Sequence, residues 1–134
     1  MARKTARELV AEAKSRIENL DNEQLEAEIA AGAVVVDIRE ANEREQSGAI
    51  PGAIHVPRGL LEFVADPESP MHRDEFDFDR RIVLHCATGG RSALAAAALQ
   101  DMGFTNVAHL EPGFNGWAAE GKPVEEVEPV WRPD

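Results

Sequence analysis

Hydrophobic and polar positions follow two different spacings along the chain, and the spacing changes several times. Apolar residues recur every three or four positions over residues 5–20 and again over 21–31, which predicts two helices. Gly32 predicts the end of the second helix. Both helices start with a polar residue followed three positions later by Glu or Gln, the pattern of a capping box: Thr5 with Glu8, and Asp21 with Gln24.

Short runs of β-branched and apolar residues predict buried strands in the rest of the chain. The predicted strands cover residues 33–38, 53–56, 82–86 and 106–110. Helical segments are predicted between and after them, over 42–46, 60–65, 91–102 and from 113 onward. Strands that alternate with helices predict an α/β domain with a mostly parallel sheet. Ligands of such sheets bind beyond the carboxyl ends of the strands.

The composition limits the classes of protein that fit this pattern. A chain of 134 residues with 43% hydrophobic content is long enough for one domain with a real core. We expect no membrane span and no secretory signal, because no long apolar run is present. The net charge of −11 argues against nucleic acid as a partner. The single cysteine excludes an internal disulfide, so we predict a cytoplasmic location.

That single cysteine, Cys86, stands where the strand predicted over 82–86 gives way to a glycine loop and a helix. Glycines at 89 and 90 allow successive backbone N–H groups to turn inward and form a nest for an anion. The nest, the start of the helix and the charge of Arg91 all favour a thiolate. We therefore predict an activated sulfur nucleophile, with an inert buried thiol as the alternative. A nucleophile also requires a sulfur that solvent can reach.

The residues around Cys86 resemble a known family. The segment Cys86-Ala87-Thr88-Gly89-Gly90-Arg91-Ser92 is similar to the active-site loop of the rhodanese sulfurtransferases. Further similar segments occur in the family's order, at 37–40, 48–57, 103–107 and 113–117. One departure is Ala49, where the family usually has His. The resemblance implies a single rhodanese domain over 21–124, with a five-stranded, mostly parallel sheet flanked by helices. It leaves an N-terminal helical arm (1–20) and an acidic, proline-containing tail (125–134).

The resemblance also implies a reaction and roles for particular residues. The Cys86 thiolate would take sulfane sulfur from a donor such as thiosulfate and pass it, as a persulfide, to cyanide or a thiol. The loop residues Ala87, Thr88, Gly89, Gly90, Arg91 and Ser92 would hold the donor, with Arg58 as a second cation. Asp37 and Arg39 would support the loop. No cofactor is implied, and the four scattered histidines predict no metal site.

Two other functions remain open at this point. Phosphatases of the cell-division-cycle type resemble this loop but place five residues between Cys and Arg, whereas four separate Cys86 from Arg91. Phosphatase or arsenate reductase activity is therefore one alternative. The other is a persulfide carrier or regulatory module that docks to a partner. His85 is expected to pack on the face of the sheet opposite Cys86. The oligomeric state is open.

Overall fold

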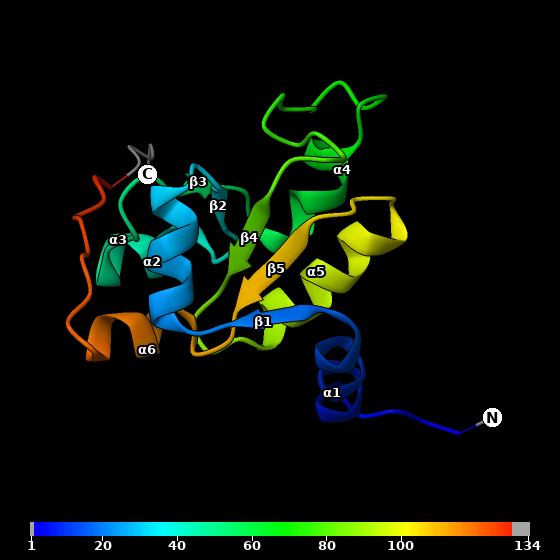
Figure 1. The fold of residues 1–134 in the computed structure, drawn as a ribbon, viewed down its shortest axis with the longest axis horizontal. Coiled ribbons are helices and arrows are strands. Elements are labelled where there is room, and N and C mark those ends of the chain that lie inside the picture. The colour runs from blue at the N-terminus through cyan, green and yellow to red at the C-terminus, as the bar shows by residue number, and fades with distance from the viewer. Residues whose placement is uncertain (1, 130–134) are drawn as a thin grey trace, which may run out of the picture.

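The computed structural model describes residues 2–129, and its centre is one five-stranded sheet (Figure 1). Every strand pairs parallel with its neighbours, in the order β1-β5-β4-β2-β3. This arrangement confirms the predicted α/β fold with a five-stranded parallel sheet. The strands are β1 (Glu18–Leu20), β2 (Val34–Asp37), β3 (Ile54–His55), β4 (Ile82–His85) and β5 (Val107–Leu110).

Helices cover both faces of the sheet, and the strand side chains divide between two apolar cores. Alternate residues of one strand show the division: Val34 and Val36 belong to one core, whereas Val35 belongs to the other. The first core is closed by α1 (Ala6–Arg16), α4 (Leu61–Ala65) and α5 (Gly90–Asp101). The second is closed by α2 (Asn22–Ala30) and α6 (Gly113–Ala119). The short helices α3 (Ala41–Ser47) and η1 (Arg58–Leu60) follow β2 and β3 along the chain.

The helix predicted over 5–20 is too long. Its start is confirmed, because the Thr5 side chain accepts a hydrogen bond from Glu8 N–H and the capping box is complete. However, α1 ends at Arg16, and residues 18–20 form β1. The open edge of β5 explains the difference, since pairing with that edge satisfies the β1 backbone and buries Leu20 in the second core. The predicted helical arm therefore ends in a strand of the sheet.

The second helix and the tail show where local patterns succeed and where they do not. The Asp21–Gln24 capping box is present, and Gly32 follows the helix with a φ of 91°. Leu25 points into the core as predicted, but Ile29, one turn later near the end of α2, is 37% exposed. The tail returns to the domain through a bridge between Ala49 and Glu125. The end of the tail, including Trp131, lies outside the described residues.

No helix within residues 2–129 combines the length and the apolar character needed to cross a membrane.

Candidate active site

Cys86 lies at the carboxyl end of β4, directly after the last strand residue. The strand ends at His85, one residue earlier than predicted. The loop that follows is short, because α5 already begins at Gly90 with Gly89 as its N-cap. Gly89 has a φ of 94°, a left-handed conformation in which its missing side chain matters. A Cβ atom at this position would collide with the carbonyl oxygen of Glu111.

The loop turns its N–H groups toward the sulfur and its carbonyl groups away from it. The backbone nitrogens of Gly89 and Ser92 donate to Cys86 Sγ at 3.2 and 3.4 Å. On the outside, the Cys86 carbonyl accepts from Phe114 N–H at 2.8 Å and the Ala87 carbonyl accepts from Asn115 N–H at 3.0 Å. The first turn of α6 thus holds the loop in the orientation that a sulfur anion needs.

The same contact between α6 and the loop explains the glycine at 113. Gly113 has a φ of 69° and packs so closely that a Cβ atom would overlap the backbone of Ala87 and Thr88. The glycine lets the start of α6 approach the loop and donate its N–H groups there. The segment 113–117, which carries part of the family resemblance, therefore has a direct structural reason in this chain.

The surroundings of Cys86 favour its thiolate. Burial by itself raises the pKa of the Cys86 thiol, but hydrogen bonds from the Ser92 hydroxyl and from the N–H groups of Ser92, Thr88 and Gly89 outweigh it. The net effect is a pKa below that of an ordinary cysteine, because these hydrogen bonds stabilise the charged form. The inward amides that the sequence predicted are present.

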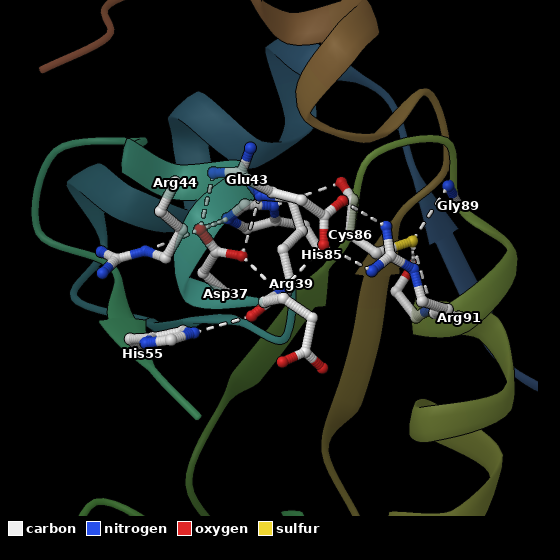
Figure 2. Close-up of polar contacts among 11 residues, drawn as sticks. Asp37, Arg39, Glu43, Arg44, His55, His85, Cys86, Gly89 and Arg91 are labelled. Carbon is white, nitrogen blue, oxygen red and sulfur yellow. Dashed lines mark hydrogen bonds and ion pairs between the residues drawn. The ribbon is translucent and has the colours of Figure 1, made fainter. Parts of the chain in front are cut away.

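The sulfur is less accessible than a nucleophile open to solvent would be. Cys86 is only 1% exposed. Arg91 lies next to the sulfur and pairs with both carboxylate oxygens of Glu43 on α3, each at 2.9 Å (Figure 2). The side chains of Arg91 and Glu43 are 41% and 30% exposed. We conclude that a small molecule reaches the sulfur only when surrounding side chains are displaced. We call the region beside the sulfur where Arg91 and Glu43 lie the mouth of the site.

Glu43 is a residue of the site that the sequence analysis missed. Its carboxylate neutralises the one cation of the loop, Arg91, and Arg91 in turn lowers the pKa of Glu43 by hydrogen bonding to it. The mixture of acidic and basic residues over 40–45 is typical of residues that form ion pairs. It does not indicate that the partner of Glu43 is Arg91, 48 positions further along the chain.

Glu43→Gln is expected to make Cys86 react faster with anions. Loss of the carboxylate leaves the charge of Arg91 free beside the sulfur, where it attracts a negative reagent. We expect the ratio of alkylation rates for iodoacetate over iodoacetamide to rise about twofold to fivefold, the scale of a partly exposed ion pair. Glu75→Gln, which breaks an ion pair with Arg73 of similar exposure, is the matched control. A ratio that stays the same or falls would show that Glu43 does not restrain Arg91.

Asp37 and Arg39 form a buried ion pair beside the site, not part of its inner surface. Two hydrogen bonds join their side chains, at 3.1 and 2.8 Å, and Arg44 adds a third contact to Asp37 at 3.1 Å (Figure 2). The Arg39 guanidinium also lies 4.1 Å from the centre of the Phe114 ring. Phe114 N–H in turn donates to the Cys86 carbonyl, so the pair contacts the helix that holds the loop. A supporting role of Asp37 and Arg39 stays a prediction.

The structure does not bring Arg58 to the loop through any contact among the described residues. Its guanidinium donates to Glu62 at 2.8 Å, one turn further along the chain. A role of Arg58 in holding a donor therefore stays a prediction. Of the predicted loop residues, Gly89 and Ser92 hydrogen-bond to the sulfur of Cys86.

His85 lies on the face of the sheet opposite Cys86, as predicted. It stacks against Phe114 in the second core, and burial lowers its pKa to about 4. Its Nε2 atom has no hydrogen-bond partner among the described residues. Asp37 Oδ2 lies 3.9 Å from that nitrogen. Within residues 2–129, no group of three His, Cys, Asp or Glu side chains is placed to hold a metal ion.

Comparison with known proteins identifies the family. The model of the rhodanese-like domain matches residues 21–120, so the chain belongs to the rhodanese-like family. A sulfurtransferase of Allochromatium vinosum is 33% identical over 110 residues, which cover 81% of this chain and 94% of that protein. The thiosulfate sulfurtransferase GlpE of Pseudomonas savastanoi is 35% identical over 98 residues, covering 72% and 83%.

A solved structure covers even more of the chain. It is a protein of unknown function from Rhodopseudomonas palustris, described as a possible tyrosine phosphatase. It is 42% identical, with a TM-score of 0.87, and the match covers 93% of this chain and 97% of the other. The family match and the two sulfurtransferases of similar sequence thus support the enzyme class of sulfurtransferases. One similar structure is instead described as a possible tyrosine phosphatase.

Proposed function

We propose that this protein is a thiosulfate sulfurtransferase that works through a persulfide on Cys86. The observation that carries the proposal is the pair of backbone N–H groups, from Gly89 and Ser92, that point at the sulfur from a loop anchored on α6. These donors stabilise the negative charge of the Cys86 thiolate on Sγ, the form that attacks the donor. The affiliation of the chain with sulfurtransferases supports the same chemistry.

The reaction has two steps, and each exchanges one bond to sulfur. In the first, the Cys86 thiolate attacks the outer sulfur of thiosulfate, a new S–S bond forms, and sulfite leaves with the electron pair of the broken bond. The terminal sulfur of the Cys86 persulfide then carries the negative charge. In the second step, cyanide or a thiolate takes that terminal sulfur, and the electron pair returns to Cys86 as a thiolate. The chain has one cysteine, so an external acceptor completes each cycle.

Phosphatase activity is the second candidate, because the Rhodopseudomonas palustris structure is described as a possible tyrosine phosphatase. The loop length speaks against it. Four residues separate Cys86 from Arg91, one fewer than in the phosphatases of the cell-division-cycle type that the loop resembles. A shorter loop gives a smaller ring of N–H groups, which suits one added sulfur atom better than a tetrahedral phosphate.

A persulfide carrier that docks to a partner is the third candidate. The near-complete burial of Cys86 favours it, because a carrier needs to react only when a partner displaces the side chains at the mouth. The reactive loop and the persulfide are the same in both cases. Turnover of free thiosulfate distinguishes them, since a carrier is loaded by thiosulfate slowly or not at all.

A cytoplasmic location and the division into arm, domain and tail also stay predictions.

Intact-mass measurement after thiosulfate treatment tests the proposed function. We expect the protein to gain the mass of one sulfur atom, and a subsequent cyanide pulse to remove it with release of thiocyanate. The same preparation is assayed with a generic aryl phosphate, which is not expected to be hydrolysed. A protein that gains no sulfur but hydrolyses the aryl phosphate would overturn the proposal in favour of the phosphatase.

A further inference from the structure

A buried chain of hydrogen bonds runs from the sulfur of Cys86 to the edge of the sheet. The Ser92 hydroxyl on α5 lies 3.5 Å from Cys86 Sγ and 2.8 Å from His109 Nδ1 on β5. His109 Nε2 lies 2.7 Å from the Oδ1 atom of Asn19 on β1. Ser92 and His109 are fully buried, and Asn19 stands directly opposite His109 in the pairing of β1 with β5. The sulfur-transfer steps above use neither His109 nor Asn19.

The orientation of Asn19 fixes the hydrogen on His109. Its Nδ2 atom lies 3.0 and 3.2 Å from the backbone carbonyls of Lys14 and Ile17, which only accept hydrogen bonds. The NH₂ group therefore belongs there, and the side-chain oxygen faces His109. An oxygen acceptor at this place requires a hydrogen on His109 Nε2. The hydrogen-bond network thus assigns the tautomer with a free lone pair on Nδ1.

The ring of His109 is neutral near pH 7. Burial and, to a smaller extent, the charge of Lys14 lower its pKa to about 4, although Glu111 acts in the opposite direction. With a lone pair on Nδ1, the ring accepts the hydrogen of the Ser92 hydroxyl. A hydroxyl has only one hydrogen, so Ser92 then presents a lone pair to Cys86 and accepts the S–H of the thiol.

We propose that His109 holds the single hydrogen of the Ser92 hydroxyl away from Cys86, and that this hydrogen turns to the sulfur only when Cys86 ionises. The thiol and the thiolate then need opposite orientations of one hydroxyl group. Ionisation breaks the bond from Ser92 to His109 and leaves Nδ1 without a donor, which costs free energy. His109 is therefore a positioning residue that makes Cys86 less acidic than the loop alone would make it.

The proposal takes Cys86 as the nucleophile and so rests on the proposed function, but it concerns only the acidity of the thiol. Three charged groups act on the network: Arg91 acts on the sulfur, while Lys14 and Glu111 shift the pKa of His109 in opposite directions. Lys14 and Glu111 also lie 3.6 Å apart as an ion pair. All three groups are kept in every variant below, so their effects on the pKa of Cys86 cancel when the variants are compared with the wild type.

The pH dependence of alkylation by iodoacetamide measures the pKa of Cys86, the only cysteine in the chain. His109→Leu removes the competing acceptor, and we expect the pKa to fall by about half to one unit, the value of one neutral hydrogen bond. Alkylation at acid pH then becomes about threefold to tenfold faster. His109→Asn is the matched variant, because its side-chain oxygen retains an acceptor near Ser92, and it is expected to behave like the wild type.

A second pair of variants shows whether His109 acts through Ser92. Ser92→Ala removes the donor to the thiolate and is expected to raise the pKa of Cys86. In the Ser92→Ala background, His109→Leu is expected to have no further effect, since the hydroxyl that links the two residues is gone. The proposal is overturned if His109→Leu leaves the pKa unchanged or raises it, or if its effect persists without the Ser92 hydroxyl.

Nitrogen NMR of the wild-type protein tests the same inference without a core substitution. We expect the imidazole of His109 to carry its hydrogen on Nε2 at neutral pH. The Nδ1 resonance is expected to move with the titration of Cys86 and to stay still in Cys86→Ala. A hydrogen on Nδ1, or an Nδ1 signal that ignores Cys86, contradicts the proposal. None of these readouts involves sulfur transfer, so they stand apart from the test of the proposed function.

Discussion

Cys86→Ser is expected to lower sulfur transfer from thiosulfate to cyanide by about a thousandfold or more, the scale on which an enzyme loses its covalent nucleophile. A serine hydroxyl keeps its proton at neutral pH, and the N–H groups of Gly89 and Ser92 then surround a neutral oxygen. An oxygen at this place also forms no S–S bond with the donor. Steady-state thiocyanate formation, measured beside the intact mass, reports both losses.

Two comparisons separate lost chemistry from lost structure. Ser92→Ala keeps the sulfur while it removes the neighbouring hydroxyl, so it is expected to gain sulfur more slowly but to the same extent as the wild type. Urea unfolding of Cys86→Ser is expected to remain close to that of the wild type, because the substitution preserves size in a buried position. Thiocyanate formation that survives in Cys86→Ser would mean that another group carries the sulfur.

Features set by neighbours in sequence were predicted well. The capping boxes at Thr5 and Asp21 satisfy N–H groups within one turn of helix, so nearby residue types suffice to predict them. The strand before Cys86, the glycine loop and the helix after it are equally local. Because these three elements determine where the sulfur and the inward N–H groups lie, the centre of the candidate site could be predicted from the sequence.

Features set by distant parts of the chain were missed. Residues 18–20 continue a helical spacing, and only the free edge of β5 makes them a strand. The partner of Arg91 depends on how α3 and α5 meet at the mouth, which no local pattern encodes. The hydrogen bond from His109 to Asn19 depends on the register between the same two strands. The strand β1, which the sequence analysis did not predict, thus supplies Asn19, the residue that hydrogen-bonds to His109.

The site joins a loop held in place to a partly exposed ion pair. The loop, β4 and the start of α6 are connected by backbone hydrogen bonds and by glycines whose Cβ atoms would collide. The ion pair is that of Arg91 and Glu43. Donors held in place in this way stabilise charge without reorganisation during a reaction. Since Cys86 is 1% exposed, we expect donor and acceptor to reach its sulfur only when surrounding side chains move.

Arg39→Leu is expected to destabilise the fold by about 3–5 kcal/mol, the range for breaking a buried ion pair. The substitution removes both side-chain hydrogen bonds from Arg39 to Asp37, the donor to the Gly48 carbonyl and the cation over Phe114, while the backbone N–H of residue 39 still donates to Asp37. Asp37, itself fully buried, then keeps only Arg44 as a cationic partner. Urea unfolding followed by circular dichroism measures the difference in free energy of unfolding.

The pH dependence of this difference identifies its cause. Burial raises the pKa of Asp37, but hydrogen bonds and charge from Arg39, together with the charge of His85, bring it below its ordinary value. A carboxyl whose pKa is lower in the folded protein adds stability above its unfolded pKa, and this stability disappears as the pH falls through the folded pKa. The difference in free energy of unfolding between the wild type and Arg39→Leu is therefore expected to be largest near neutral pH and to become smaller below about pH 4.

Two further variants show whether the loss comes from an uncompensated charge. Arg16→Leu breaks an exposed pair with Asp101 and is expected to leave the free energy of unfolding close to that of the wild type. Asp37→Asn combined with Arg39→Leu removes both buried charges and is expected to recover part of the stability that Arg39→Leu loses. If the double variant is no more stable than Arg39→Leu, the loss comes from packing against Phe114 and not from the charge of Asp37.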